Sequence, residues 1–158
     1  MKKLILIYCL FLIFNMVVSA QHANVGEKAP SINADVWLNH QINTNSLKGK
    51  TIVLDFWFVD CPPCIKSIPH LNNLATMYKK ANVVFLAITF DKKEKVEKFM
   101  AKTPIVSYVG IDTLENTAKA FQVSLYPKTF VIDSKGIIRW KGSPMNLNES
   151  ILKPILQK

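Results

Sequence analysis

The sequence predicts an α/β fold with a mixed central sheet, helices on both faces of the sheet and an N-terminal β-hairpin extension. Apolar stretches typical of buried strands alternate with segments whose apolar residues recur every three or four positions, which is the period of a helix. A late pair of strands joined by a short turn then adds antiparallel pairing. The chain has 158 residues, of which 49% are apolar, and this is enough to bury the core of one such domain.

Residues 1–20 predict a secretory signal peptide rather than a part of the fold. Lys2 and Lys3 form a basic start, residues 4–18 are almost entirely apolar, and small residues follow as a cleavage site. The apolar run is short for a membrane-spanning helix, although a retained N-terminal anchor is the alternative. We therefore expect one domain at 21–158, located in the periplasm or otherwise outside the cytoplasm.

The first thirty residues of this domain predict an extended lead-in. Weak alternation at 33–38, a turn at 39–41 and a short segment at 42–44 are typical of a β-hairpin. Residues 47–50 then predict the loop into the first central strand.

The central strand is predicted at residues 51–59, because this stretch is rich in β-branched and aromatic residues. A helical pattern follows and runs to Tyr78. Two cysteines separated by two prolines lie at the junction, with Cys61 near the helix N-cap. Pro62 falls near the first helical position, where a proline loses no hydrogen bond.

The remaining elements follow from the same two periods and from local turn signals. Gly136 occupies a turn position that favours a positive φ, and Asn148 is suited to cap a last helix, which Pro154 weakens. The predicted elements are a strand at 83–90, a helix at 94–102, a strand at 105–109, a helix at 114–121, a hairpin of strands 129–133 and 137–140, and a helix from 148 to 156.

The position of the cysteines at the start of a helix has a chemical consequence. Free backbone N–H groups and the positive end of the helix dipole favour a thiolate at Cys61, the form of a cysteine that attacks disulfides. Cys64 lies one turn further on, close enough to resolve a mixed disulfide. We therefore predict that Cys61 is the nucleophile and Cys64 the resolving thiol. This chemistry requires that Cys61 be within reach of another protein.

Asp55 lies in the middle of the apolar strand, where an ionised carboxylate is costly. Burial would raise its pKa toward neutrality and would allow it to accept and return the proton of Cys64. We therefore predict that Asp55 is a third catalytic residue. The alternative is an aspartate on a strand edge that faces water, because a continuous apolar run does not show which face a residue occupies.

At these residues the chain resembles the thioredoxin superfamily and, more narrowly, the TlpA/ResA-like extracytoplasmic thiol-disulfide oxidoreductases. The resemblance extends over most of the chain from about Val25 onward. The residues that carry it are Asp55-Phe56-Trp57, Cys61, Cys64, Pro69, Tyr126-Pro127-Lys128-Thr129-Phe130-Val131-Ile132-Asp133, Gly26-Glu27-Lys28-Ala29-Pro30 and Leu47-Lys48-Gly49-Lys50.

The resemblance implies a thioredoxin fold and further site residues. Pro127 would follow a cis peptide bond that faces Cys61, and the backbone of Tyr126 would pair with an extended substrate peptide. We also place Pro62 on the substrate-binding surface. The resemblance implies a buried acid at Asp55, as in thioredoxins, whereas TlpA-like members often carry a neutral residue at this position.

Asp60 departs from the family pattern, which usually places tryptophan directly before the first cysteine. An acid there opposes the thiolate, favours the disulfide and would make the cysteine pair a stronger reductant. The alternative is a solvated aspartate whose charge is screened by water and salt.

The cysteine count favours a chemical role over a structural one. Cleavage after Ala20 removes Cys9 and leaves a single close pair, which constrains the unfolded chain little. The three histidines lack the spacing of a zinc site, so we expect neither metal nor cofactor. The net charge of +9 comes from scattered lysines without an aromatic-basic stripe, so we expect no nucleic-acid partner.

The leading hypothesis is an exported, monomeric thiol-disulfide oxidoreductase that reduces protein disulfides. The resemblance implies electrons from a membrane thiol donor and disulfide-containing exported substrates, with apocytochrome c as one candidate and cytochrome c biogenesis as the setting. A thiol oxidase would use the same cysteine pair. A peroxiredoxin-like peroxidase would need threonine and proline where this chain has Phe58 and Leu54. A Cu(I)-binding protein of the same fold would use a wider cysteine spacing and a later histidine.

Overall fold

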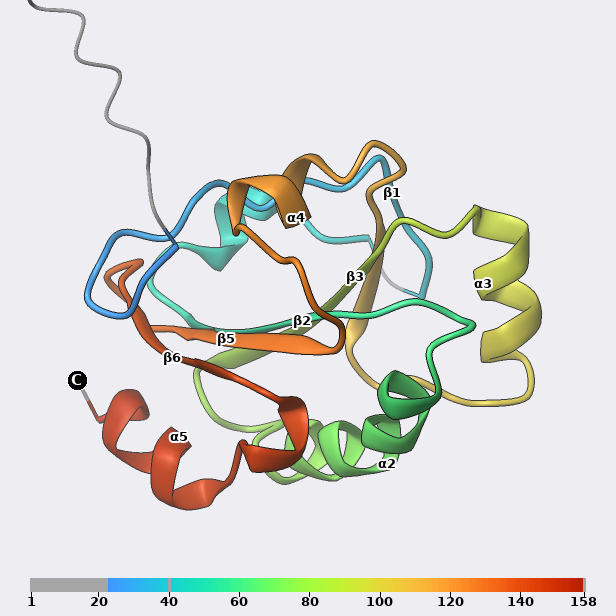
Figure 1. The fold of residues 1–158 in the computed structure, drawn as a ribbon. Helices are drawn as coiled ribbons and strands as arrows, with labels where there is room; N and C mark the ends of the chain where they lie inside the picture. Colours follow the sequence, from blue (N-terminus) through green and yellow to red (C-terminus); the bar gives the residue numbers. More distant parts are fainter. Residues whose placement is uncertain (1–22, 40, 158) are drawn as a thin grey trace, which may run out of the picture.

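The computed structural model describes residues 23–39 and 41–157, so the expected signal peptide lies outside the described residues. The described chain forms a six-stranded sheet in the order β1-β4-β3-β2-β5-β6 (Figure 1). The strands are β1 (Val36–Trp37), β2 (Thr51–Phe56), β3 (Val83–Thr89), β4 (Tyr108–Ile111), β5 (Lys128–Ile132) and β6 (Ile138–Gly142). The helices are α2 (Pro62–Met77), α3 (Lys93–Met100), α4 (Asn116–Ala120) and α5 (Glu149–Leu156), with short 3₁₀ helices η1 (Thr44–Leu47) and η2 (Pro144–Asn146).

The sheet is mixed, as the sequence predicts. Strands β2, β3 and β4 are parallel to one another, while β5 pairs with β2, and β6 with β5, in antiparallel orientation. The parallel strands are connected by α2 and α3, which supply the crossovers that parallel pairing requires. The predicted thioredoxin fold is therefore confirmed.

Two apolar cores lie on opposite faces of the sheet, because alternate residues of each strand point to opposite sides. Val53 of β2 packs with α2 and α5, whereas Leu54 packs with α4 and the segment around η1. Figure 1 shows α2 and α5 on one side of the sheet and α4 on the other. The prediction of helices on both faces is confirmed, and the helix that begins at the cysteines is held against the central strand.

The predicted N-terminal hairpin is wrong. β1 pairs with β4 in antiparallel orientation, and residues 42–44 lead into η1 instead of forming a strand. Asn43 explains the second point, because its side chain accepts a hydrogen bond from the backbone N–H of Asn45 and caps η1. Asn39 explains why β1 pairs with β4, because its side-chain amide forms hydrogen bonds with the backbone around β4 at Ile105, Ser107 and Val109.

Two predicted elements are shifted along the sequence. The strand predicted at 105–109 occupies Tyr108–Ile111, and the polar atoms of Asn39 and Asn72 bond residues 105–107 in its place. The helix predicted at 114–121 is shortened to α4, and Leu114, expected on its apolar face, is 66% exposed. The central strand is also shorter than predicted, because β2 ends at Phe56.

The C-terminal elements form as predicted. Gly136 has a φ of 80° in the turn between β5 and β6, a conformation that a residue with a Cβ adopts at a cost. The side chain of Asn148 accepts a hydrogen bond from the N–H of Ile151 and caps α5, which continues through Pro154. Between residues 23 and 157, leaving out residue 40, each helix lacks either the length or the apolarity required to cross a membrane.

Candidate active site around Cys61 and Cys64

The two cysteines lie at the start of α2, directly after the central strand. Cys61 is the N-cap residue, and its sulfur accepts a hydrogen bond from the N–H of Cys64 over 3.2 Å. Pro62 follows at the first helical position, as predicted. The cysteines are joined by a disulfide with their Cα atoms 5.2 Å apart, so the structure represents the oxidised form. A sulfur so placed also faces the positive end of the helix dipole.

The disulfide is largely covered by neighbouring side chains. Cys61 keeps 3% of its surface exposed and Cys64 keeps 1%. This is less than we expect for a sulfur that reacts with another protein. The residues on either side of Cys61 are Asp60, Pro62 and Pro63, and all three are exposed. A protein that reacts with the small exposed part of Cys61 would therefore contact these three residues.

Asp55 is buried beneath this site, as predicted, and the water-facing alternative is excluded. It is 5% exposed on β2, between Ala87 of β3 and Thr129 of β5. Burial raises the pKa of Asp55 to about 7, and a 2.6 Å hydrogen bond donated by the Thr129 hydroxyl opposes part of that rise. Sequence reasoning missed Thr129 as a partner of Asp55, because nothing local shows which strands will be neighbours.

The segment before β5 brings an aromatic side chain to the site. The Tyr126–Pro127 peptide bond is cis, as predicted. The Tyr126 ring packs on Phe58, which precedes the cysteines, with the ring centroids 5.5 Å apart, and on Phe90 with the centroids 5.8 Å apart. Burial, together with Glu115 close to the hydroxyl, raises the pKa of Tyr126 to about 12, so the phenol stays protonated at neutral pH.

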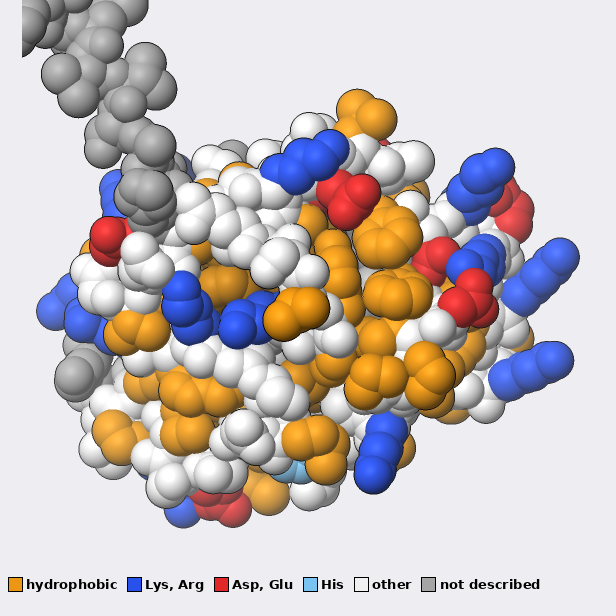
Figure 2. Space-filling model, in the orientation of Figure 1, with side chains coloured by type: hydrophobic (Ala, Val, Ile, Leu, Met, Phe, Trp, Pro, Cys, Tyr) orange, Lys and Arg blue, Asp and Glu red, His pale blue; other side chains and the backbone are white. Residues whose placement is uncertain are grey.

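Apolar side chains lie on one side of the disulfide, where Phe58 and Tyr126 pack in the same cluster as the two cysteines. Phe58, Phe90 and Tyr126 are half-buried, and Leu125 is largely exposed. Figure 2 shows apolar side chains gathered on the face of the molecule that lies between α4 and α3. An apolar surface next to a reactive sulfur is suited to contact another polypeptide.

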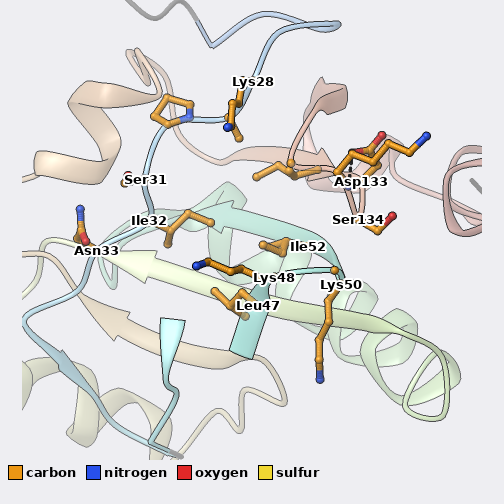
Figure 3. Close-up of a pocket in the computed structure, with 16 residues that line it drawn as sticks. Lys28, Ser31, Ile32, Asn33, Leu47, Lys48, Lys50, Ile52, Asp133 and Ser134 are labelled. Carbon is orange, nitrogen blue, oxygen red and sulfur yellow. Dashed lines mark hydrogen bonds between the residues drawn. The ribbon is translucent and has the colours of Figure 1, made fainter. Parts of the chain in front are cut away.

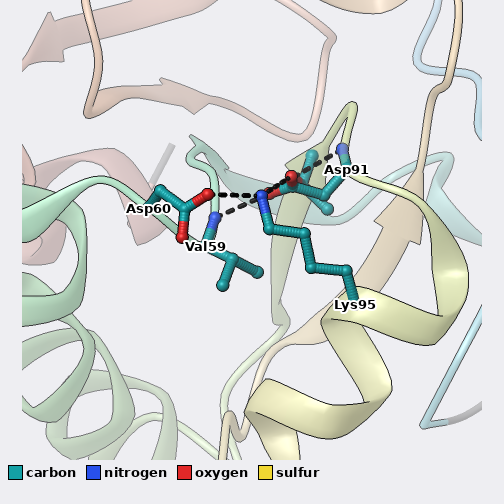
Figure 4. Close-up of polar contacts among 5 residues, drawn as sticks. Val59, Asp60, Asp91 and Lys95 are labelled. Atoms are coloured by element: carbon teal, nitrogen blue, oxygen red, sulfur yellow. Dashed lines mark hydrogen bonds and ion pairs between the residues drawn. The ribbon is translucent and has the colours of Figure 1, made fainter.

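Asp60 is ion-paired, which neither of our two sequence hypotheses anticipates. Its carboxylate lies 2.7 Å from the Lys95 ammonium of α3, and the same ammonium lies 2.6 Å from Asp91 at the end of β3 (Figure 4). Asp91 also accepts a 2.6 Å hydrogen bond from the N–H of Val59. The four-residue spacing of Asp91 and Lys95 is a helical pairing signal that the sequence contains, whereas the contact with Asp60 depends on the fold.

Metal-ligating side chains do not gather around the cysteines. The described residues contain no group of three or more histidine, cysteine and acidic side chains placed to hold a metal ion. The imidazole Nε2 of His70 lies 2.7 Å from the carbonyl oxygen of Leu147, which gives this residue a structural contact.

A cavity among the described residues lies at the opposite end of β2 from the disulfide. It has a volume of about 470 Å³ and lies at the start of β2 and the end of β5, whereas the cysteines follow the other end of β2 (Figure 3). Residues such as Ile32, Ile52 and Ser134 line it. Disulfide exchange needs an approachable sulfur rather than an enclosing pocket, so the cavity does not compete with the cysteine site.

Comparisons with known proteins place this site in a family. Residues 25–141 match the model of the AhpC/TSA family. The thiol-disulfide oxidoreductase ResA of Geobacillus kaustophilus is 32% identical over 116 residues, which cover 73% of this chain and 67% of that protein. ResA of Bacillus subtilis is 31% identical over 128 residues, which cover 80% of this chain and 72% of that protein.

Solved structures share the fold. A thiol:disulfide interchange protein of the thioredoxin family from Chlorobium tepidum superposes with a TM-score of 0.69 and 26% identity, covering 82% of this chain and 95% of that one. A thioredoxin-like protein solved in its oxidised form gives a TM-score of 0.70 at 21% identity, covering 89% of this chain and 98% of that one, and so supports the fold alone. Together with the cysteine pair at the start of α2, these similarities show that the chain belongs to the AhpC/TSA family as a thiol-disulfide oxidoreductase with a thioredoxin fold.

Proposed function

We propose that this protein is exported and reduces disulfide bonds in other exported proteins through Cys61 and Cys64. The observation that carries the proposal is the cysteine pair at the N-terminus of α2, joined in a disulfide above a buried carboxylate. Its expected partners are proteins that contain disulfides, with apocytochrome c as one candidate, and a membrane thiol donor. The export proposal rests on residues 1–20, which have the composition of a signal peptide.

The reaction begins with the reduced protein. The Cys61 thiolate attacks one sulfur of the substrate disulfide, forms a mixed disulfide and releases the other substrate sulfur as a thiolate. Cys64 then attacks the Cys61 sulfur and releases the second substrate thiolate. Two electrons pass from the protein to the substrate, and the protein is left in the disulfide form that the structure represents.

Asp55 serves the second step in this proposal. The thiol of Cys64 must lose its proton before it attacks, and a carboxylate with a pKa of about 7 can accept that proton at neutral pH. Thr129 holds one oxygen of Asp55 in place through its hydrogen bond. The backbone of Tyr126, next to the cis bond to Pro127, would bind an extended substrate segment, and Pro62 would border it on the other side.

The reduction potential distinguishes a reductase from an oxidase. Disulfide oxidoreductases that reduce proteins have potentials near −270 mV, whereas a strong oxidase has one near −120 mV. We expect a value below about −200 mV for the Cys61–Cys64 pair, measured by equilibration in glutathione or dithiothreitol buffers. A value near that of the oxidase would reverse the proposed direction and leave the chemistry intact.

A trapping experiment tests the assignment of the two cysteines. Cys64→Ser removes the resolving thiol, so we expect mixed disulfides with exported proteins to accumulate at Cys61, visible on non-reducing gels and identified by mass spectrometry. Cys61→Ser is the matched control and should trap none. Equal trapping by both variants, or by neither, would contradict the proposed roles.

The alternative functions lack the residues that they require. Leu54 and Phe58 occupy the positions where a peroxidase of the related type needs proline and threonine, and both are packed, Leu54 in the core and Phe58 on Phe90. A copper site would have two thiolates, without a histidine beside them among the described residues. Peroxide consumption and copper titration of the reduced protein test these two alternatives directly.

A further inference from the structure

One ammonium group links the loop before Cys61 to the body of the protein. Lys95 Nζ lies 2.7 Å from Asp60 Oδ2 and 2.6 Å from Asp91 Oδ1 (Figure 4). The three side chains come from three segments: the loop that precedes Cys61, the end of β3 and the first turn of α3. We refer to Asp60, Asp91 and Lys95 as the Lys95 cluster.

Asp91 is the buried member of the Lys95 cluster. Its side chain is 7% exposed, and its Oδ2 atom accepts the N–H of Val59 over 2.6 Å while Oδ1 receives the ammonium. A buried carboxylate is stable only when its oxygens are paired. Asp91 therefore fixes both the main chain of the loop and the position of Lys95, which is thereby held close to Asp60.

Asp60 is the member that affects the sulfur. It directly precedes Cys61, and its side chain is 76% exposed. An unpaired carboxylate at this position would disfavour a thiolate on the next residue. Two other ionisable groups lie near the cysteines. Asp55 has a pKa raised to about 7 by burial, so it is mostly protonated and neutral at pH 6, and Tyr126 stays neutral because its pKa is about 12.

We propose that Lys95 is a positioning residue that offsets the charge of Asp60 and so preserves the reactivity of the Cys61 thiolate. The proposal rests on the proposed function, in which Cys61 is the nucleophile. It also explains how the chain tolerates an acid directly before a cysteine that must ionise. Exposed ion pairs are weak, so the expected effect on an equilibrium constant is no more than about fivefold.

Lys95→Met tests this proposal. We expect the apparent pKa of the Cys61 thiol to rise and its rate of alkylation by iodoacetamide at pH 6 to fall about two- to fivefold, a range set by exposed ion pairs. The reduction potential of the cysteine pair should become more negative, because a destabilised thiolate favours the disulfide. Lys95→Arg should restore both values, since the guanidinium keeps the charge.

A double-variant cycle separates charge from structure. Without the acid, Lys95 has nothing to offset, so Lys95→Met should change the alkylation rate much less in an Asp60→Asn background. Lys93→Met is the matched control, because Lys93 lies on the same helix and pairs with Glu97 at the exposed surface. The control should leave the alkylation rate and the potential unchanged.

The possible results are distinct. If Lys95→Met leaves the rate and the potential at the wild-type values, or lowers the rate equally with and without Asp60→Asn, the proposal is overturned. Failure of the proposed function would appear elsewhere, in wild-type Cys61 that reacts as an ordinary thiol and in a Cys64→Ser variant that traps no partner.

Discussion

The surroundings of Asp55 decide the pKa of its carboxyl group. The same aspartate on a strand edge would be a surface acid, whereas here it is 5% exposed with a pKa raised to about 7 by burial. A carboxyl group with this pKa exists in both protonation states at neutral pH. It can therefore take up and return a proton within one reaction cycle.

Asp55→Asn should slow disulfide reduction by about 100-fold, which is the lower end of the range for general acid–base catalysis. The amide retains an oxygen for the Thr129 hydroxyl, so the local hydrogen bond is preserved. Stopped-flow measurement of single turnovers should show that Cys61 still forms the mixed disulfide while its resolution becomes slow. The wild-type rate of resolution should rise through about pH 7 as Asp55 loses its proton, and the variant should lack this rise. Equal rates in the two proteins would remove Asp55 from the mechanism.

At the scale of the elements, helix N-termini organise both the site and the fold. α2 begins at Cys61, whose sulfur accepts the N–H of Cys64 as a cap. α4 has a different arrangement, because its N-cap residue Glu115 has a left-handed backbone and forms no side-chain cap. The buried carboxylate of Asp112 instead accepts the N–H groups of Asn116 and Thr117. At α4, an acid that follows β4 therefore takes the place of an N-cap side chain.

Asp112→Ala should therefore lower the free energy of unfolding by about 1–2 kcal/mol, the upper part of the range of about 0.5–2 kcal/mol measured when a helix cap is removed. Urea unfolding followed by circular dichroism measures this change. Asn148→Ala is a useful comparison, because Asn148 caps α5 with one hydrogen bond to Ile151 at the exposed surface and should cost less. If Asp112→Ala lowers the free energy of unfolding no more than Asn148→Ala does, the interpretation that Asp112 caps α4 through two hydrogen bonds is contradicted.

The errors in our prediction of the elements have a shared cause. Residues 105–109 and 42–44 have the composition of strands, but asparagine side chains bond their backbone or that of neighbouring residues and divert the chain from the sheet. Leu114 suits an apolar helix face, yet α4 begins only at Asn116, whose N–H is bonded by the carboxylate of Asp112. Such side-chain-to-backbone bonds join residues that are often far apart in sequence, so periodicity does not reveal them.

At the scale of the whole molecule, the order of the strands assembles the site. β2 lies between β3 and β5, so the loop that leads from β2 to the cysteines meets Asp91 after β3 through the N–H of Val59, and Tyr126 before β5 through the ring of Phe58. Active residues in such sheets gather where strands end, because the loops converge there. The cavity lined by Ile32, Ile52 and Ser134 lies at the opposite end of β2, so the cavity and the cysteine site are separated by the length of the strand.

The burial of Asp55 also sets how the stability of the whole fold depends on pH. The folded protein holds the proton with a pKa of about 7, whereas an unfolded aspartate has a pKa of 3.8, so the folded state binds more protons between these values. The free energy of unfolding should therefore fall as the pH rises from about 4 to about 7. Each pKa unit corresponds to 1.36 kcal/mol, so the loss is on the order of 4 kcal/mol.

Asp55→Asn should remove this loss, because the amide carries no charge at any of these pH values. We expect the variant to be more stable than the wild type at pH 8 and to match it most closely near pH 4. Urea unfolding of the oxidised proteins across this range provides the comparison. A wild-type stability that does not decline between pH 4 and 7 relative to the variant would argue against a buried, neutral Asp55.

The sequence by itself determined the fold class, the cysteine pair at a strand-to-helix junction, the turn at Gly136 and the cap at Asn148. These are local properties, set by residue spacing and by the backbone preferences of glycine, proline and capping residues. The family resemblance added the cis bond before Pro127.

Only the tertiary structure decided which distant groups meet at the site. Thr129 reaches Asp55 across 74 positions of sequence, and Lys95 reaches Asp60 because α3 packs beside the loop before Cys61. The physical reason is that the pKa of an acid and the reactivity of a thiol depend on burial and on neighbouring charges. Both arise only when strands and helices pack together.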